Sequence, residues 1–331
     1  MQGRREAPLF HGVQPMALFS ATLPILILAA IGFTIARAGL FSPQDFSTLG
    51  RFVVMLALPA LLFRTMAELP VAEIIEPGYI LAYLGGTLFV IATGYCSWRL
   101  FGNAPGDVAA IRTMGMACPN SGFVGYPLML LSFPAIAGKV LALNMTVENL
   151  VVIPLLLALA ESGRQKGPGA LATLKKTIVE LARNPMIIGL LGGFAWSLSG
   201  FALPEVIRHP VDMLAAASGA ISLIVIGGML ARSEISSWNV PVLLTISGKL
   251  LFQPLAVVFM LMVVTALGFP VTDPDLRKAL VISGAISVMG IYPLLSLRYG
   301  LAESSAVVLA GSTVASFVTL NVVMLIADKL F

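Results

Sequence analysis

The chain has 331 residues, of which 58% are hydrophobic and only 11% charged, with a mean hydropathy of +0.96 and a net charge of +4. Soluble globular chains are about half apolar and about a quarter charged, so this composition excludes an ordinary soluble domain. The sequence contains no nucleotide-binding glycine loop, no metal-ligand cluster and no Ser/His/Asp set, so we expect no cofactor, no metal, no nucleic-acid partner and no ATP-driven pump.

Apolar segments that are long enough to cross a bilayer recur along the whole chain. A helix needs roughly 20 apolar residues to cross about 30 Å of hydrocarbon. The segments are continuously apolar and do not alternate with period two, which excludes a transmembrane β-barrel. We therefore predict an all-α polytopic membrane protein with about ten transmembrane helices. In chain order, the predicted spans are Met16–Arg37, Leu49–Ala67, Pro77–Leu100, Asp107–Phe133, Lys139–Ala160, Asn184–Leu203, Val211–Ala231, Val240–Leu267, Ala279–Leu297 and Ser304–Ala327.

The connections predict how the chain is oriented in the membrane. Residues 1–15 lack an A-x-A-like cleavage site and are interpreted as an N-terminal extension. Residues 161–183 carry five basic side chains and an amphipathic stretch, which predicts a cytoplasmic linker by the positive-inside rule. With five spans on each side of this linker, both termini lie outside the cytoplasm, and the protein is expected in the plasma or inner membrane.

Two halves of the chain, 16–160 and 184–331, carry related sequence. Pro24, Gly32-Phe33 and Gly39 match Pro185, Gly193-Phe194 and Gly200 at a constant offset, and Tyr126-Pro127-Leu128 matches Tyr292-Pro293-Leu294 at a slightly larger one. An odd number of spans in each half means that the two repeats are inverted relative to each other. We predict two inverted five-helix repeats on this basis.

The fourth predicted span is interrupted in its middle. Residues 118–127 include two prolines and two glycines, which remove backbone donors and lower helix stability by several kcal/mol. Pro119, Gly125 and Pro127 are predicted to break the helix, and Pro293 has the same role in the ninth span. An unwound segment survives in a membrane only inside protein or beside a watery cavity. The alternative is an ordinary proline kink.

Paired broken spans at corresponding places predict the site of a transporter. If the two breaks cross, two helix N-termini, each carrying about half a positive charge, face one point. Neither break contains Asp or Glu, so the crossing favours an anion such as a carboxylate. The candidate substrate-binding residues at the breaks are Asn120, Ser121, Gly122, Ser287, Met289 and Gly290.

Two ionisable residues lie deep in predicted spans, where a charge costs roughly 2.5 kcal/mol or more. Glu148, with Asn144 and Asn149, is a candidate for binding a coupling proton or cation, and the alternative is a protonated carboxyl that packs between helices. Lys249, with Gln253 one turn on, is a candidate for contacting a substrate carboxylate or Glu148. A lysine stem that reaches the headgroups is the alternative.

The run Asn120-x-Gly122-Phe123-x-Gly125-x-Pro127-Leu128 resembles the N-x-G-F-x-G-x-P-L element of the auxin efflux carrier family, and Leu58-Pro59-Ala60-Leu61-Leu62-Phe63 resembles its second-helix element. The resemblance implies ten helices as an inverted repeat, with a scaffold domain and a crossover domain. It also implies homodimers and elevator-like movement of small carboxylates, with malonate and malate among the substrates of bacterial members. The ninth span lacks the second crossover Asn of plant members, which resembles the malonate-carrier branch and leaves Ser287 as the nearest polar substitute.

The leading hypothesis is a secondary active transporter of a small organic anion, which works in the lipid bilayer by alternating access. A sodium-coupled symporter or a cation/proton antiporter of the same broad fold is the alternative, and a channel stays open. Coupling to protons, to sodium, to exchange or to membrane potential is compatible with the sequence. An intramembrane enzyme is disfavoured because the spans hold one deep acid and no deep His.

Overall fold

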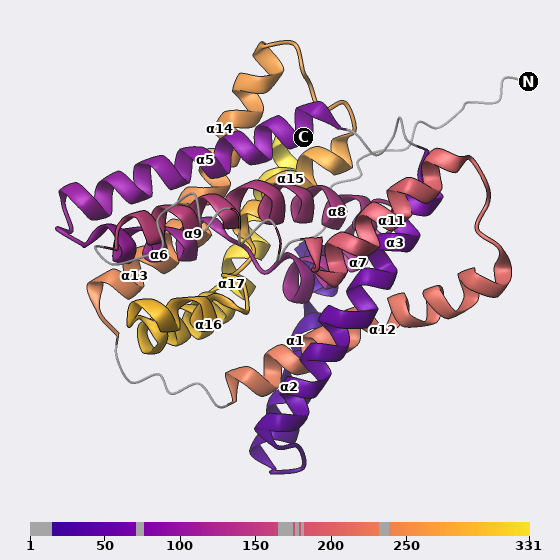
Figure 1. The fold of residues 1–331 in the computed structure, drawn as a ribbon, viewed down its shortest axis with the longest axis horizontal. Helices are drawn as coiled ribbons and strands as arrows, with labels where there is room; N and C mark the ends of the chain where they lie inside the picture. Colours follow the sequence, from indigo (N-terminus) through magenta and orange to yellow (C-terminus); the bar gives the residue numbers. More distant parts are fainter. Residues whose placement is uncertain (1–14, 71–75, 165–174, 176–178, 180–181, 232–237) are drawn as a thin grey trace, which may run out of the picture.

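The computed structural model describes the chain except for residues 1–14, 71–75, 165–174, 176–178, 180–181 and 232–237. Residues 1–14 of the predicted extension 1–15 and most of the predicted linker 161–183 lie outside the described residues, and residue 15 begins the first helix. The described part is all-helical, as predicted, and it contains no strand (Figure 1).

Among the residues that the structure describes, six continuous helical runs are long and apolar enough to cross a membrane. They are α2–η1–α3 (Pro43–Glu68), α5 (Pro77–Leu100), α8–η3–α9 (Ala137–Ser162), α12 (Glu205–Leu230), α13–η4–α14 (Val240–Ala266) and α17 (Ala302–Leu330). Two further predicted spans correspond to α1 (Pro15–Arg37) and α11 (Pro185–Ser199). The fourth predicted span is an interrupted segment made of α6 (Gly106–Ala117), η2 (Ser121–Gly125) and α7 (Tyr126–Ser132). The ninth is a second interrupted segment made of α15 (Pro274–Ala285), α16 (Tyr292–Ser296) and η5 (Leu297–Tyr299). The chain is thus a multi-pass helical protein, and the inverted repeat stays a prediction.

The helices pack as two groups, each of which takes elements from both halves of the chain (Figure 1). The framework group comprises α1, α2, η1, α3, α11 and α12, in which α1 packs on α12 and α11 on α3. The crossing group comprises α5 to α9 and α13 to α17, in which α5 packs on α14 and α6 on α9. The two groups meet where α7 and η2 contact α12, and where α8 contacts α3.

In the described part of the chain, four membrane-spanning segments contain one widened π-helical turn, and each turn is followed by a proline. In each case the residue before the proline donates its N–H to the carbonyl five residues back, as Ile153 does to Glu148 and Gln253 does to Gly248. The proline ring clashes with the carbonyl four residues earlier and offers no N–H, so a widened turn accommodates it without ending the helix. The four turns are η1, η2, η3 and η4, followed by Pro59, Pro127, Pro154 and Pro254.

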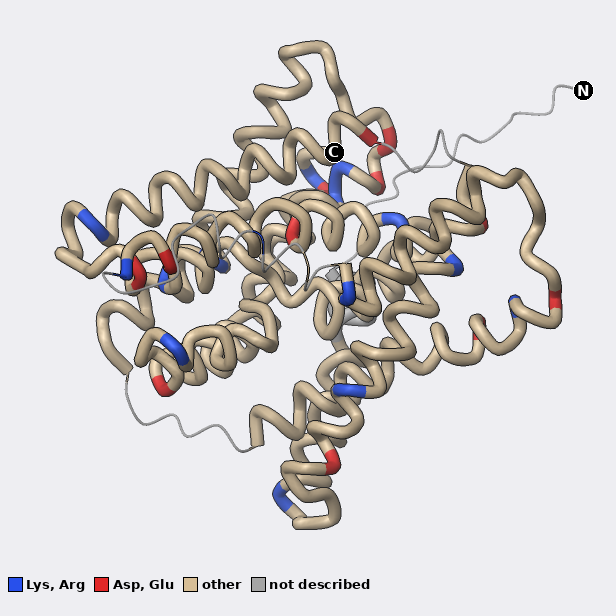
Figure 2. Tube along the Cα trace, in the orientation of Figure 1, with Lys and Arg blue, Asp and Glu red and all other residues tan. Residues whose placement is uncertain are grey.

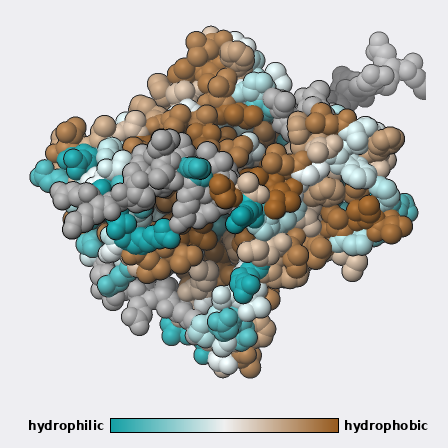
Figure 3. Space-filling view, viewed as in Figure 1, coloured by the Kyte–Doolittle hydropathy of each residue, from teal (hydrophilic) through white to brown (hydrophobic). Residues whose placement is uncertain are grey.

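The outer surface suits a lipid environment. Apolar residues cover much of the face shown in Figure 3, and most charged residues lie toward the ends of helices or the margins of the molecule in Figure 2. Glu148 and Lys249 depart from this rule, because they are only 4% and 0% exposed. These two buried ionisable side chains need partners inside the protein.

Candidate functional site

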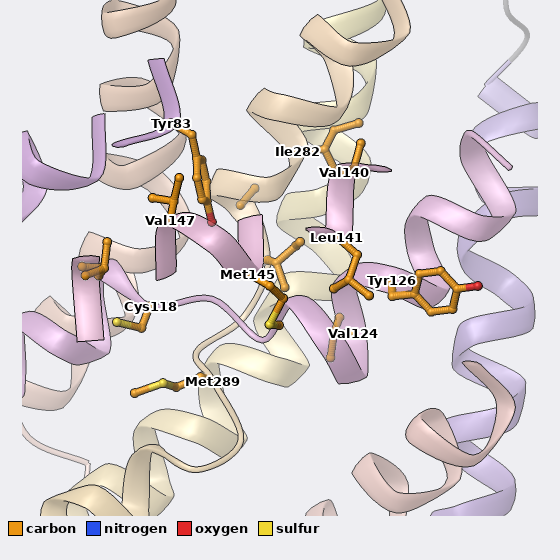
Figure 4. Packing of buried hydrophobic residues seen from close by; sticks show 14 of the residues in the cluster. Tyr83, Cys118, Val124, Tyr126, Val140, Leu141, Met145, Val147, Ile282 and Met289 are labelled. Carbon is orange, nitrogen blue, oxygen red and sulfur yellow. The ribbon is translucent and has the colours of Figure 1, made fainter. Parts of the chain in front are cut away.

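The two interrupted segments cross and pair with each other. Asn120 N donates to Ser287 O at 2.8 Å, and Met289 N donates to Cys118 O at 3.0 Å. These two bonds flank an antiparallel bridge between Pro119 and Val288. The unwound backbone therefore satisfies part of its hydrogen-bonding demand through the other broken segment, as apolar surroundings require. Figure 4 shows the side chains of Cys118 and Met289 near this crossing.

The extended parts are shorter than the sequence predicts. The first covers only Cys118–Asn120, and of the predicted helix-breaking residues only Pro119 lies in it. Gly125 lies in η2, and Pro127 and Pro293 lie in the first turns of α7 and α16. A proline in a first helical turn costs little, because the missing N–H would be unpaired there. Pro127 and Pro293 therefore mark where the helices resume.

Asn120 and Ser287 place unpaired polar atoms at the crossing. Asn120 Oδ1 caps the resuming helix by accepting from Phe123 N at 3.3 Å, but its Nδ2 has no partner within the described residues. Ser287 Oγ is also buried without a partner there, and the two residues are 3% and 0% exposed. A Cβ added to Gly290 would lie 3.7 Å from Asn120 Nδ2, so Gly290 lies beside this amide. A buried unpaired group costs about 1–3 kcal/mol, which a bound ligand can recover.

Glu148 reaches the crossing from η3. Its Oε1 accepts hydrogen bonds from Ser121 Oγ at 2.7 Å and from Tyr83 Oη at 2.8 Å. Neither break contains an acidic residue, but the fold brings the carboxyl of Glu148 to the resuming helix from another helix. The predicted coupling residue and the predicted substrate residue Ser121 thus share one site.

Tyr83 and Tyr79 are site residues that the sequence analysis missed. Tyr79 Oη donates to Asn144 Oδ1 at 2.8 Å, and Asn144 Nδ2 donates to Ser283 Oγ at 2.9 Å. The available signal was the spacing of Tyr79 and Tyr83, which lie four residues apart in an apolar span, since a buried tyrosine hydroxyl usually needs a partner. Asn149 does not join this network, because its amide donates to Met145 O of its own helix at 2.9 Å.

Lys249 and Gln253 lie at the C-terminal ends of α6 and α15, the helices that precede the two extended parts. Gln253 Nε2 donates to Ala117 O, at the end of α6, at 2.9 Å. Lys249 Nζ donates to Gln253 Oε1 at 2.7 Å and to Gly284 O, in the last turn of α15, at 2.8 Å. The side chain is completely buried, so it does not extend to the headgroups, and no ion pair joins it to Glu148 within the described residues.

Comparisons with known proteins indicate that this chain is a transporter. The family model described as membrane transport protein matches residues 17–324. Over 235 residues, 70% of this chain and 72% of the relative, the sequence is 27% identical to a protein of Rhizobium meliloti (strain 1021) described as "Putative malonate transporter". Over 115 residues, 34% of this chain and 37% of the relative, it is 30% identical to an "Uncharacterized transporter" of Methanothermobacter thermautotrophicus (strain Delta H).

The family match spans both broken segments and all the helices that hold them in place. It agrees with the motif at Asn120–Leu128, and it points to a transporter rather than an enzyme. The chain therefore belongs to the membrane transport protein family, the auxin efflux carrier family that its broken fourth span resembles.

Proposed function

We propose that this protein is a secondary active carrier of a small organic anion, a carboxylate, and that the substrate binds where the two broken segments cross. The observation that carries the proposal is the pair of buried polar atoms without partners, Asn120 Nδ2 and Ser287 Oγ. Both groups are hydrogen-bond donors, and a carboxylate is a strong acceptor of such bonds.

The chemistry of the crossing supports an anion of small size. A hydrogen bond to a charged group contributes about 1.5–3 kcal/mol, twice or more what most neutral pairs contribute. The helical segment Ser121–Ser132 begins at the crossing, and its N-terminus adds partial positive charge. The name of the Rhizobium relative refers to malonate, so we take short dicarboxylates as the first substrate class to test.

Glu148 gives the proposal a coupling step. An ionised Glu148 beside Ser121 repels an arriving carboxylate, and a protonated one does not. We infer that substrate and proton bind together, with the proton on Glu148. Tyr83 and Ser121 both donate to Oε1, which leaves Oε2 as the oxygen that carries the proton.

The same residue supports the second candidate, a cation/proton antiporter or sodium-coupled symporter of this broad fold. Such proteins hold an acid near the crossing, and the Glu148–Ser121 hydrogen bond puts one there. In that case Glu148 binds the transported or coupling cation. The two candidates differ in which solute stabilises the folded protein.

The wider arrangement that we propose follows the family resemblance. The framework group serves as a scaffold and the crossing group carries the substrate by an elevator-like, alternating-access movement. The protein works as a homodimer in the plasma or inner membrane, with both termini outside the cytoplasm.

The test is thermal unfolding of the purified protein against malonate, malate, succinate, indole-3-acetate, taurocholate, amino acids, sodium and lithium. A ligand that binds only the folded state stabilises it by about 2.7 kcal/mol at 100 times its Kd. We expect a carboxylate to raise the Tm, and Asn120→Ala to abolish that shift. Asn120→Asp keeps the cap on Phe123 but loses the donor and adds a charge, so it also abolishes the shift.

Asn149→Ala is the matched control, since this buried amide bonds to its own helix and should keep the full shift. A shift with sodium alone, or with taurocholate plus sodium, would favour the cation-coupled candidate. An unchanged carboxylate shift in Asn120→Ala would place the substrate elsewhere.

A further inference from the structure

Two helices, α6 and α15, end at the crossing, and two helical segments, η2–α7 and α16, begin after it. The N-terminal and C-terminal ends have different surroundings. The N-terminal ends, after Asn120 and Ile291, lie beside the unpaired atoms of the proposed substrate site. The C-terminal ends, Ala117 of α6 and Ala285 of α15, present carbonyl oxygens that no helical N–H can reach. Each C-terminal end carries about half a negative charge, so their convergence favours a cation.

A protein side chain already supplies that cation. Lys249 Nζ lies 2.8 Å from Gly284 O and 2.7 Å from Gln253 Oε1, and both oxygens are of the carbonyl type that binds small monovalent cations in proteins. Gln253 links Lys249 to the end of α6, because its Nε2 donates to Ala117 O at 2.9 Å. One ammonium group and one amide therefore join the C-terminal end of α6 to that of α15.

The complete burial of the Lys249 side chain means that its ammonium group depends on partners inside the protein. Lys249 and Gln253 are both 0% exposed, and a buried ammonium is tolerated only with close partners. Within the described residues no ion pair joins Lys249 to an acidic side chain, and its direct partners are the carbonyl-type oxygens of Gly284 and Gln253. The widened turn η4 (Gly248–Phe252) contains Lys249 and contacts both α6 and α15.

We propose that the ammonium group of Lys249 is a built-in monovalent cation, which occupies a carbonyl-lined cation site at the C-terminal ends of α6 and α15 and fixes their geometry. Lys249 is then a positioning residue and does not contact the substrate. This inference rests on the crossing itself, so it stands or falls independently of which solute the protein carries.

The experiment empties the site and offers it free cations. Lys249→Ala removes the ammonium group and leaves the two oxygens bare, and the purified variant is unfolded thermally in chloride salts of n-propylammonium, sodium or choline at equal ionic strength. We expect a fall in Tm of about 5–10 °C in choline, as for loss of a buried charged partner in a chain of this size. Propylammonium, which replaces the lost atoms, or sodium should restore at least half of that fall, whereas the wild-type Tm should be equal in all three salts.

The control is Leu250→Ala, which truncates the neighbouring buried side chain in the same turn and exposes no oxygen. It should lose stability equally in all three salts. If Lys249→Ala also responds equally to all three, or is as stable as the wild type, the proposal is wrong.

A second variant keeps the test decisive if Lys249→Ala yields no folded protein. Lys249→Gln preserves much of the volume and one donor but removes the charge. We expect it to fold with a Tm below that of the wild type, and to show the same preference for sodium over choline. A Lys249→Gln protein with wild-type stability in choline would overturn the proposal, because the charge would then be unnecessary. Failure to fold with every salt present during purification would also count against it.

Discussion

At the scale of single residues, the proposed coupling of transport to protons rests on Glu148. Glu148→Gln keeps an oxygen that accepts from Ser121 and Tyr83 but cannot take up a proton at neutral pH. We expect the variant to fold and to bind the carboxylate, since the repelling charge is gone. Transport into proteoliposomes should lose its dependence on an imposed pH gradient, measured as the ratio of initial rates with and without the gradient.

Tyr83→Phe is the control, because it removes one hydrogen bond to Glu148 and leaves the carboxyl in place. It should cost about 1–3 kcal/mol of stability and keep the response to the pH gradient. If Glu148→Gln responds to the gradient as the wild type does, the coupling proton lies on another group.

The residue types of the site were predictable from sequence, but their partners were only partly so. Asn120, Ser121 and Glu148 stand out because polar and ionisable residues are costly in apolar spans. The contact between Ser121 and Glu148 depends on how two helices pack, which local patterns do not encode. Lys249 is the clearest case: its carbonyl partner Gly284 lies 35 residues along the chain, whereas the sequence suggests a substrate or Glu148 as its partner.

At the scale of elements, the framework helices approach so closely that glycine is required. A Cβ on Gly193 of α11 would overlap the carbonyl oxygen of Phe63 on α3 and lie 2.8 Å from Met66 Cβ. Overpacking of this kind typically costs about 1–3 kcal/mol. We expect Gly193→Ala to lower the Tm of the purified protein by several degrees, about 2–6 °C.

Gly192 provides the comparison one residue away. A Cβ there would lie 3.6 Å from the Phe63 ring, which is ordinary contact, and alanine favours a helix by up to about 1 kcal/mol over glycine. Gly192→Ala should therefore leave the Tm unchanged or raise it. Equal losses in both variants would mean that α11 and α3 are not in the close contact described here.

Helix ends were harder to predict than helices. Hydropathy placed the start of the ninth span at Ala279, but α15 begins at Pro274, where Asp273 caps it. The first turns of α15 carry charged residues, so a search for apolar segments leaves them out. The breaks were visible because proline and glycine act locally. The widened turns before Pro154 and Pro254 were not predicted, since a proline in an apolar run is equally compatible with a kink.

At the scale of the whole molecule, the proposed mechanism requires the crossing group to move against the framework group. The contact between α3 and α8 joins the two groups, and a Cβ built on Gly138 of α8 would lie 3.1 Å from Thr65 Cβ of α3. Disulfides span about 3.5–4.5 Å between Cβ atoms, so a slight separation lets cysteines at both positions bond once the Thr65 hydroxyl is gone. A Thr65→Cys/Gly138→Cys variant, made with Cys96→Ser because Cys96 is the exposed native thiol, therefore tests the movement.

We expect oxidation of the double-cysteine variant to stop uptake of the stabilising carboxylate into proteoliposomes, and reduction to restore it. Binding to the oxidised protein, measured as the Tm shift, should persist, because the crossing at Asn120 and Ser287 lies within one group. The two single-cysteine variants under the same oxidant should transport normally, which separates the cross-link from damage. If the fully cross-linked protein transports as fast as the same variant with its disulfide reduced, then α3 and α8 move together. The boundary between fixed and moving parts would then lie elsewhere.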